Sequence, residues 1–228
     1  MRSWSPTGRK ATTHLSFAKS TPPELTSSLA REAHEIVLAR HGETEWSRSG
    51  QHTGRTDVPL TEAGRNQAQI VGAALRNRRF EAVWTSPLSR AAETCRLAGF
   101  EGVAVPKDEL MEWDYGEYEG RTTPEIRSER PGWTLWSEGV PSGETIDQVG
   151  ARVDQLLAEA SSVPGDLLLF AHGHVLRVLA ARWLGLEPGG GRLFALDPAT
   201  LSALGYEREA RVIKLWNEAA SLTSHGRG

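Results

Sequence analysis

Residues 166–174 of this chain read Asp-Leu-Leu-Leu-Phe-Ala-His-Gly-His. A short apolar run between polar residues is typical of a β-strand buried on both faces, and such strands occur in parallel sheets that helices cover on both sides. The apolar residues that follow extend to Trp183, and Gly185 then provides a helix stop. The stretch therefore predicts a central strand at 166–171, a helix that ends at Trp183, and polar side chains at the carboxyl end of the strand.

Strands and helices alternate on both sides of this stretch. Apolar periodicity predicts helices at 61–76 and 142–161, and a third helix that Ser86 caps, Pro87 begins and Gly99 ends. Short apolar segments predict strands at 34–40, 82–85, 200–206 and 211–216. The alternation predicts the α/β class, as a three-layer αβα sandwich with a mostly parallel central sheet and helices on both faces.

The composition is that of an ordinary soluble globular protein, with 39% hydrophobic and 24% charged residues among 228. Cys95 is the only cysteine, which excludes an intrachain disulfide and a zinc site built from several thiolates. A net charge of -3 argues against a nucleic-acid-binding surface, and no apolar run approaches the ~20 residues of a membrane span. We expect a cytoplasmic monomer or homodimer without nucleic-acid or membrane partners.

The first 33 residues differ from the rest of the chain. They carry five basic and two acidic residues, are rich in Ser, Thr and Pro, and have no apolar periodicity. This composition is typical of a disordered tail, although a basic, Ser/Thr-rich start is also compatible with an organelle-targeting segment or with a start codon assigned too early. We expect a tail at 1–33, a single domain at 34–218 and a flexible C-terminus at 219–228.

Polar residues follow three of the predicted strands. One strand ends in Arg40-His41-Gly42, the next is followed by Ser86–Arg90, and the third by His172-Gly173-His174. In open α/β sheets ligands bind beyond the carboxyl ends of the strands, so these residues are expected to meet at one edge. Arginine binds phosphate oxygens through paired hydrogen bonds, and histidine serves as a nucleophile or proton carrier. The sequence therefore predicts a site for a phosphoryl group.

Four ordered elements carry a specific resemblance. Arg40–Thr44 and Thr53–Thr61, followed by Ser86–Ala91 and Ala171–His174, resemble the signatures of the histidine phosphatase superfamily in its phosphoglycerate mutase-like branch. The likeness extends from Glu35 to Trp216.

The resemblance implies a role for each matching residue. His41 would be the nucleophile, and Glu112 would protonate the leaving alkoxide and then activate water. The phosphoryl oxygens would be bound by Arg40, Arg90, His172, Thr53 and Gly54. No metal and no other cofactor is expected. Further candidates for the site are Ser47, Asp114 and His174.

Several of these assignments have alternatives. Asp114 competes with Glu112 as proton donor, and as a nearby like charge it would raise the pKa of Glu112 if the two carboxylates share a face. His174 is as consistent with packing as with a substrate contact. Four tryptophans have two equally good explanations, packing in the core or in a lid, and a position in the wall of the site. They are Trp46, Trp113, Trp133 and Trp136. Gly189–Arg192 is expected to be a turn, since it lacks the remainder of a nucleotide P-loop.

Departures from the mutase pattern favour a phosphatase. Gly173-His174 stands where mutases have Gly-Asn, Ser47 stands where they usually have Asn, and no Arg-Arg pair occurs between Gly120 and Thr145. Residues 112–120 resemble acid phosphatase and sugar-bisphosphatase members more closely. We therefore expect a metal-independent phosphomonoester hydrolase that acts on small phosphorylated metabolites through a phosphohistidine.

A cofactor-dependent phosphoglycerate mutase is the alternative, and a non-catalytic phosphoryl-binding module is a weaker one. The sequence does not identify the substrate. The arginines of the short insertion either bind a second anionic group of the substrate or are simply solvated, and the sequence does not decide between the two. These arginines are Arg121, Arg127 and Arg130.

Overall fold

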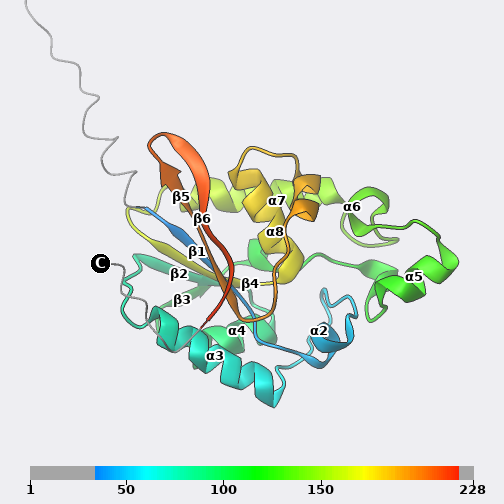
Figure 1. Ribbon diagram of the computed structural model, residues 1–228, viewed down its shortest axis with the longest axis horizontal. Coiled ribbons are helices and arrows are strands. Elements are labelled where there is room, and N and C mark those ends of the chain that lie inside the picture. The colour runs from blue at the N-terminus through cyan, green and yellow to red at the C-terminus, as the bar shows by residue number, and fades with distance from the viewer. Residues whose placement is uncertain (1–33, 221–228) are drawn as a thin grey trace, which may run out of the picture.

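The computed structural model describes residues 34–220 (Figure 1). The expected tail at 1–33 and all but two residues of the expected C-terminal extension lie outside the described residues. The elements in chain order are β1 (Ile36–Arg40), α2 (Glu45–Ser49), α3 (Glu62–Leu75), β2 (Ala82–Thr85), α4 (Ser89–Leu97), β3 (Ala104–Pro106), the 3₁₀ helices η1 (Asp108–Leu110) and η2 (Gly116–Tyr118), α5 (Thr123–Glu129), α6 (Leu135–Glu138), α7 (Ile146–Ala160), β4 (Leu167–Ala171), α8 (Gly173–Trp183), the 3₁₀ helix η3 (Pro188–Leu193), β5 (Thr200–Glu207) and β6 (Ala210–Ala219).

The described residues form a six-stranded sheet in the order β3-β2-β4-β1-β5-β6. The four strands from β3 to β1 run parallel, whereas β5 and β6 pair antiparallel at one edge. β4 lies between β2 and β1, and all five of its residues are buried. The expected buried central strand and the mostly parallel sheet are thus confirmed.

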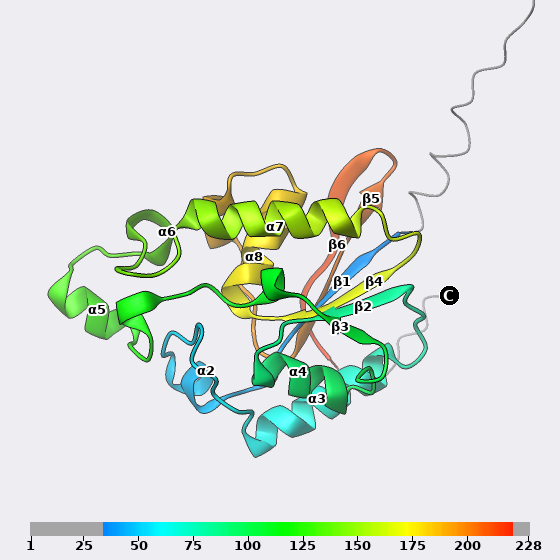
Figure 2. The same cartoon turned by 180° about the vertical axis from the view of Figure 1, so that it is seen from behind.

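Helices cover both faces of this sheet. α7 and α8 lie on one face and α3 and α4 on the other, as the two opposite views show (Figures 1 and 2). Because side chains alternate along a strand, Leu167 and Leu169 join the core beneath α7 and α8, while Leu168 and Phe170 join the core beneath α3 and α4. The expected α/β fold in three layers is confirmed.

Two predicted helix starts were too early. α4 begins at Ser89 with Leu88 as its N-cap, and no side chain caps it, because the Ser86 hydroxyl instead lies 2.7 Å from His172 Nε2. α7 begins at Ile146, where Thr145 and Gln148 form a capping box. The residues before it form a turn in which Ser142 has a φ of 59°.

The sequence did not predict α2, β3 or the elements within residues 107–145, and Gly189–Arg192, expected to be a turn, lies in the 3₁₀ helix η3. The segment 107–145 holds η1, η2, α5 and α6, and α5 and α6 lie together with α2 at one end of the molecule (Figure 1). α2 and this insertion are joined through Gln51, which donates to the Gly120 carbonyl at 2.7 Å, and through His52, whose carbonyl accepts from the Gly120 N–H at 2.9 Å. No helix within residues 34–220 is both long enough and apolar enough to be a membrane span.

Candidate active site

Two adjacent parallel strands bring the two histidines together. Arg40 at the end of β1 pairs in register with Ala171 at the end of β4. The next residues, His41 and His172, therefore lie side by side, with ring centroids 5.1 Å apart. Residues far apart in the sequence thus meet at the carboxyl edge of the sheet.

His41 is buried in a defined protonation state. Its Nδ1 lies 2.7 Å from the Gly42 carbonyl oxygen. Since a carbonyl can only accept, the proton of the neutral ring lies on Nδ1 and the lone pair on Nε2. Burial lowers the pKa of His41 well below its ordinary value, and the charges of Arg40 and Arg90 lower it further. His41 is therefore neutral at neutral pH, which is the nucleophilic form.

His172 carries its proton on the other nitrogen. Its Nδ1 accepts a hydrogen bond from Arg90 Nε at 3.1 Å, which leaves Nε2–H to donate to the Ser86 hydroxyl at 2.7 Å. Burial, followed by the charge of Arg90, holds the pKa of His172 well below its ordinary value. The sequence did not assign a role to Ser86 beyond helix capping, but its hydroxyl orients this ring.

Arg90 is fully buried in the first turn of α4. Besides His172, it donates to the carbonyls of Thr53, Gly54 and Thr56 at 2.9–3.1 Å. Thr53 lines the cavity described below, whereas Gly54 lies behind it and contributes its carbonyl to Arg90. These bonds fix the guanidinium beside both histidines.

Arg40 lines the cavity, and one of its N–H groups has no hydrogen-bond partner among the described residues. Its Nη1 donates to the Leu196 carbonyl, while its buried Nε has no partner among the described residues. Gly173 lets α8 approach the guanidinium closely, because a Cβ at that position would lie 3.2 Å from Arg40 Cζ. Burial lowers the pKa of Arg40, yet an arginine stays charged at any ordinary pH.

Glu112 is nearly buried and faces the start of α8. Its carboxylate accepts three backbone N–H bonds, from Trp113 at 3.0 Å and from His174 and Val175 at 2.9 Å each. His172, the N-cap of α8, makes no side-chain capping bond, so Glu112 satisfies the free N–H groups of that helix. The contacts hold the carboxylate in one place beside the histidines.

A cavity of about 180 Å³ opens between these groups. Among residues 34–220 it is lined by Arg40, His41, Ser47, Gly50, Gln51, His52, Thr53, Glu112, Tyr115, Gly173, His174, Arg177 and Leu196. Ser47 and His174, which were further candidates, both line it, and the Tyr115 hydroxyl lies 2.6 Å from His174 Nδ1. With Arg40 and Arg177 in its wall and Arg90 behind it, the cavity suits an anion.

Sequence reasoning missed Arg177, His52 and Tyr115. Arg177 follows Gly173 by four residues, so helical spacing alone places it on the face of α8 that looks into the cavity. His52 and Tyr115 come from irregular segments and had no comparable signal in the sequence.

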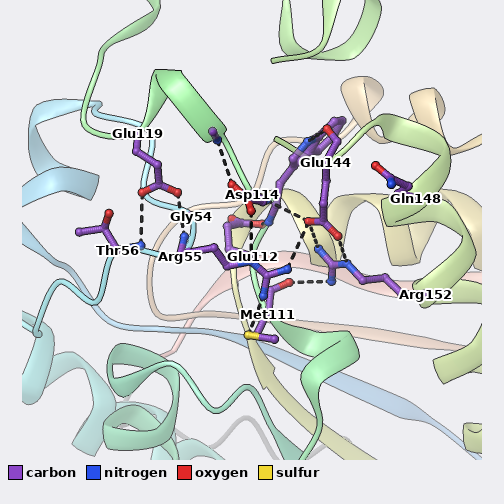
Figure 3. Close-up of polar contacts among 12 residues, drawn as sticks. Gly54, Arg55, Thr56, Met111, Glu112, Asp114, Glu119, Glu144, Gln148 and Arg152 are labelled. Atoms are coloured by element: carbon purple, nitrogen blue, oxygen red, sulfur yellow. Dashed lines mark hydrogen bonds and ion pairs between the residues drawn. The ribbon is translucent and has the colours of Figure 1, made fainter. Parts of the chain in front are cut away.

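Asp114 lies outside the set of residues that line the cavity. Its Oδ1 accepts the Gly116 N–H at 2.9 Å and its Oδ2 lies 3.9 Å from Arg55 Nε (Figure 3). The carboxylate thus has partners of its own, and the expected like-charge contact with Glu112 is not among its contacts in the part of the chain that the structure describes.

The remaining candidates pack against their neighbours. Trp113 and Trp133 belong to the buried core, and Trp136 lies against Trp113 and His174. The insertion arginines are held locally: Arg121 by Glu129, Arg127 by the Trp133 carbonyl and Arg130 by the Tyr118 hydroxyl. Within residues 34–220 no three His, Cys, Asp or Glu side chains converge in a way that could hold a metal ion.

A family model agrees with this arrangement. The model described as "Histidine phosphatase superfamily (branch 1)" matches residues 36–219, which is nearly the whole described chain.

Curated relatives of known name cover most of the chain. An acid phosphatase of Mycobacterium tuberculosis (strain ATCC 25618 / H37Rv) is 40% identical over 196 residues, which are 84% of this chain and 94% of the relative. A sedoheptulose 1,7-bisphosphatase of Saccharomyces cerevisiae is 39% identical over 66% of this chain and 67% of its own. A probable phosphoglycerate mutase GpmB of Yersinia enterocolitica is 31% identical over 84% of this chain and 94% of its own.

Solved structures have the same fold. The product of a Mycobacterium tuberculosis open reading frame superposes with a TM-score of 0.78 at 38% identity, covering 82% of this chain and 98% of the other. A mycobacterial glucosyl-3-phosphoglycerate phosphatase, solved with VO3, gives 0.74 at 28% identity over 82% of this chain and 100% of its own.

Proposed function

This chain belongs to branch 1 of the histidine phosphatase superfamily, and we propose that it hydrolyses phosphomonoesters of small metabolites through a phosphohistidine on His41. The observation that carries the proposal is the 2.7 Å contact between His41 Nδ1 and the Gly42 carbonyl oxygen, which places the ring proton on Nδ1. The lone pair of Nε2 is thereby free for attack, in a cavity whose wall contains arginine. The relatives named acid phosphatase and sedoheptulose 1,7-bisphosphatase support the same reaction type.

The first step transfers the phosphoryl group to the protein. The lone pair of His41 Nε2 forms the N–P bond while the bond from phosphorus to the ester oxygen breaks. Glu112, in its protonated form, gives its proton to the departing alkoxide. Arg40 and Arg90 balance the charge of the phosphoryl oxygens, and the neutral ring of His172 orients Arg90 by accepting from its Nε. The unpartnered Nε of Arg40 supplies a donor for one of the phosphoryl oxygens.

The second step releases phosphate. Glu112, now a carboxylate, takes a proton from water, whose oxygen bonds to phosphorus as the N–P bond breaks. The products are the alcohol and inorganic phosphate, and His41 and protonated Glu112 are regenerated. Atoms and protons therefore balance among the substrate, water, His41 and Glu112, and no redox partner is needed.

Phosphoglycerate mutase activity is the second candidate, and a relative named as a probable phosphoglycerate mutase favours it. A mutase must retain its intermediate and exclude water. The arginines of the insertion, which could have bound a substrate carboxylate, are engaged with Glu129, the Trp133 carbonyl and the Tyr118 hydroxyl. Hydrolysis is therefore the better match.

The test is turnover of glycerol 2-phosphate in the presence of EDTA, followed as released phosphate. We expect hydrolysis that is insensitive to EDTA, and an acid-labile phosphoenzyme that His41→Ala abolishes together with turnover. Phosphate exchange between phosphoglycerates, primed by a bisphosphate and without net hydrolysis, would instead establish the mutase. Binding of phosphate with neither activity would establish a non-catalytic module.

We also propose a cytoplasmic location and a monomeric or homodimeric state. Support comes from the substrate class, since phosphorylated metabolites belong to that compartment, and from a lone buried thiol at Cys95. Cell fractionation and sedimentation of the purified chain test the two statements.

A further inference from the structure

Glu112 is carried by an irregular segment whose backbone is held from outside the cavity. Arg152 on α7 donates from Nη1 to the carbonyls of Glu109 and Met111, at 2.7 Å each. These carbonyls lie three residues and one residue before Glu112. A single guanidinium group thus fixes the chain on the N-terminal side of the carboxylate.

Glu144 holds the C-terminal side in the same way. Its Oε2 accepts the N–H of Asp114 at 2.9 Å, its own N–H donates to the Asp114 carbonyl at 3.0 Å, and its carbonyl accepts from Trp113 Nε1 at 2.8 Å. The two residues after Glu112 are therefore fixed as firmly as those before it.

Arg152 and Glu144 act as one unit. Arg152 Nε and Nη2 donate to the two oxygens of Glu144 at 2.8 and 3.0 Å, and the side chains are only 14% and 17% exposed. Arg55 completes the group, with Nη2 3.7 Å from Glu144 Oε2 and Nε 3.9 Å from Asp114 Oδ2 (Figure 3). Two arginines balance two carboxylates, and the bidentate geometry between Arg152 and Glu144 is the most directional kind of ion pair.

Neither Arg152 nor Glu144 is among the residues that line the cavity. They instead join α7 to the segment of Glu112, whose carboxylate reaches the first N–H groups of α8. We propose that Arg152 and Glu144 are positioning residues that set the place of the Glu112 carboxylate for proton transfer. This inference rests on the proposed function, because it assumes that Glu112 is the proton donor.

The test compares two substrates in single-turnover formation of the phosphoenzyme. Glycerol 2-phosphate needs a proton on its leaving group, whereas p-nitrophenyl phosphate releases a stable anion. A displaced acid costs about 10²-fold when a proton is needed. We expect Arg152→Met and Glu144→Gln to lose that much in rate on glycerol 2-phosphate and far less on p-nitrophenyl phosphate, with the half-saturating concentration of each substrate unchanged. Arg152→Lys, which keeps the positive charge and one donor nitrogen, recovers part of the loss.

A double variant separates positioning from a general effect on the fold. If Arg152 acts through Glu112, Arg152→Met has nothing more to remove once Glu112 is Gln, so the double variant loses no more than Glu112→Gln alone. Arg182→Met is the matched control. Arg182 on α8 makes a bidentate pair with Asp154 at 2.8 Å for both bonds and donates to the Leu186 carbonyl at 3.0 Å. We expect Arg182→Met to leave unchanged the ratio of the rates measured with the two substrates.

Thermal unfolding is recorded for every variant, and Glu144→Gln and Arg152→Lys carry the test if Arg152→Met does not fold. Equal losses on the two substrates, or a further loss in the Glu112→Gln background, would overturn the inference. A wild-type chain that hydrolyses neither substrate would overturn the proposed function and the inference with it. Leaving-group dependence in Glu112→Gln, but in neither Arg152→Met nor Glu144→Gln, would overturn the inference alone.

Discussion

The two histidines of the site differ in which ring nitrogen carries the proton. The Gly42 carbonyl places it on Nδ1 of His41, and Arg90, which can only donate, places it on Nε2 of His172. One ring therefore offers a lone pair from Nε2 and the other an N–H from the same atom. Under the proposed function the difference assigns the nucleophile to His41, whereas the N–H of His172 donates to the Ser86 hydroxyl.

The choice between Glu112 and Asp114 can be made with two variants. Glu112→Gln is expected to slow hydrolysis of an alkyl phosphate by about 10²–10⁴-fold and to slow phosphoenzyme formation from p-nitrophenyl phosphate much less. Asp114→Asn keeps an oxygen for the Gly116 N–H, so we expect a modest effect that does not depend on the leaving group. Rapid-quench measurement with both substrates checks this. A leaving-group-dependent loss in Asp114→Asn, and none in Glu112→Gln, would show that the acid is Asp114.

At the scale of elements, the sequence predicted those whose pattern is local. β4 was recognisable because all five of its residues are apolar and buried, and α7 because its buried residues repeat at helical spacing. α5 has seven residues, α6 has four, and η1 and η2 have three each, which is too short for a periodic apolar pattern. Trp133, between α5 and α6, donates from Nε1 to the Gly139 carbonyl and packs on Tyr118, and neither contact leaves a periodic signal.

In the candidate site, too, the sequence revealed the residues that belong to a local pattern and missed those that act through distant contacts. Arg40, His41 and His172 lie directly at strand ends, and parallel pairing of β1 with β4 brings them together. Arg152 and Glu144 act through the carbonyls and N–H groups of residues 109–114. Backbone groups are the same for every residue type, so no sequence motif could have revealed that contact.

α3 and α4 pack so closely that a glycine is required between them. A Cβ on Gly72, in the last turn of α3, would lie 2.6–2.9 Å from backbone atoms of Ala98. Glycine to alanine in a helix interior ordinarily stabilises by about 1 kcal/mol. At Gly72 we expect the opposite sign, a destabilisation of about 1–3 kcal/mol from overpacking.

Urea denaturation of Gly72→Ala measures this change. Gly102→Ala is the control, since nothing lies within 4 Å of its Cβ position, and its unfolding free energy should stay within about 0.5 kcal/mol of wild type. An increase in stability for Gly72→Ala would mean that α3 and α4 are further apart than described.

At the scale of the whole molecule, the sheet concentrates buried charge at one edge. The central strand β4 is apolar throughout and His172 follows it directly, while Arg40 is the last residue of β1 and Arg90 and Glu112 are buried nearby. A site of this kind strengthens electrostatic contacts with a phosphate because it excludes water. The same burial must also affect the stability of the fold, since groups that stay neutral when folded gain protons when unfolded.

The stability of the fold should therefore fall in mild acid. Burial and neighbouring arginines hold the pKa of both His41 and His172 well below their ordinary values. Below about pH 6.5 the unfolded chain binds protons on these rings while the folded chain does not, so the unfolding free energy decreases as the pH falls, by roughly 1.4 kcal/mol per pH unit for each ring. Above that pH neither state binds a proton there, and the contribution is constant. His172→Gln removes one of the two titrating rings and retains an acceptor for Arg90 and a donor for Ser86. Urea unfolding at pH 7.5 and 5.5 should thus show a loss of stability that is smaller in His172→Gln than in wild type by about 1.4 kcal/mol. An equal loss in the two proteins would mean that folded His172 takes up its proton as readily as the unfolded chain does, and that the ring is not held neutral by its surroundings.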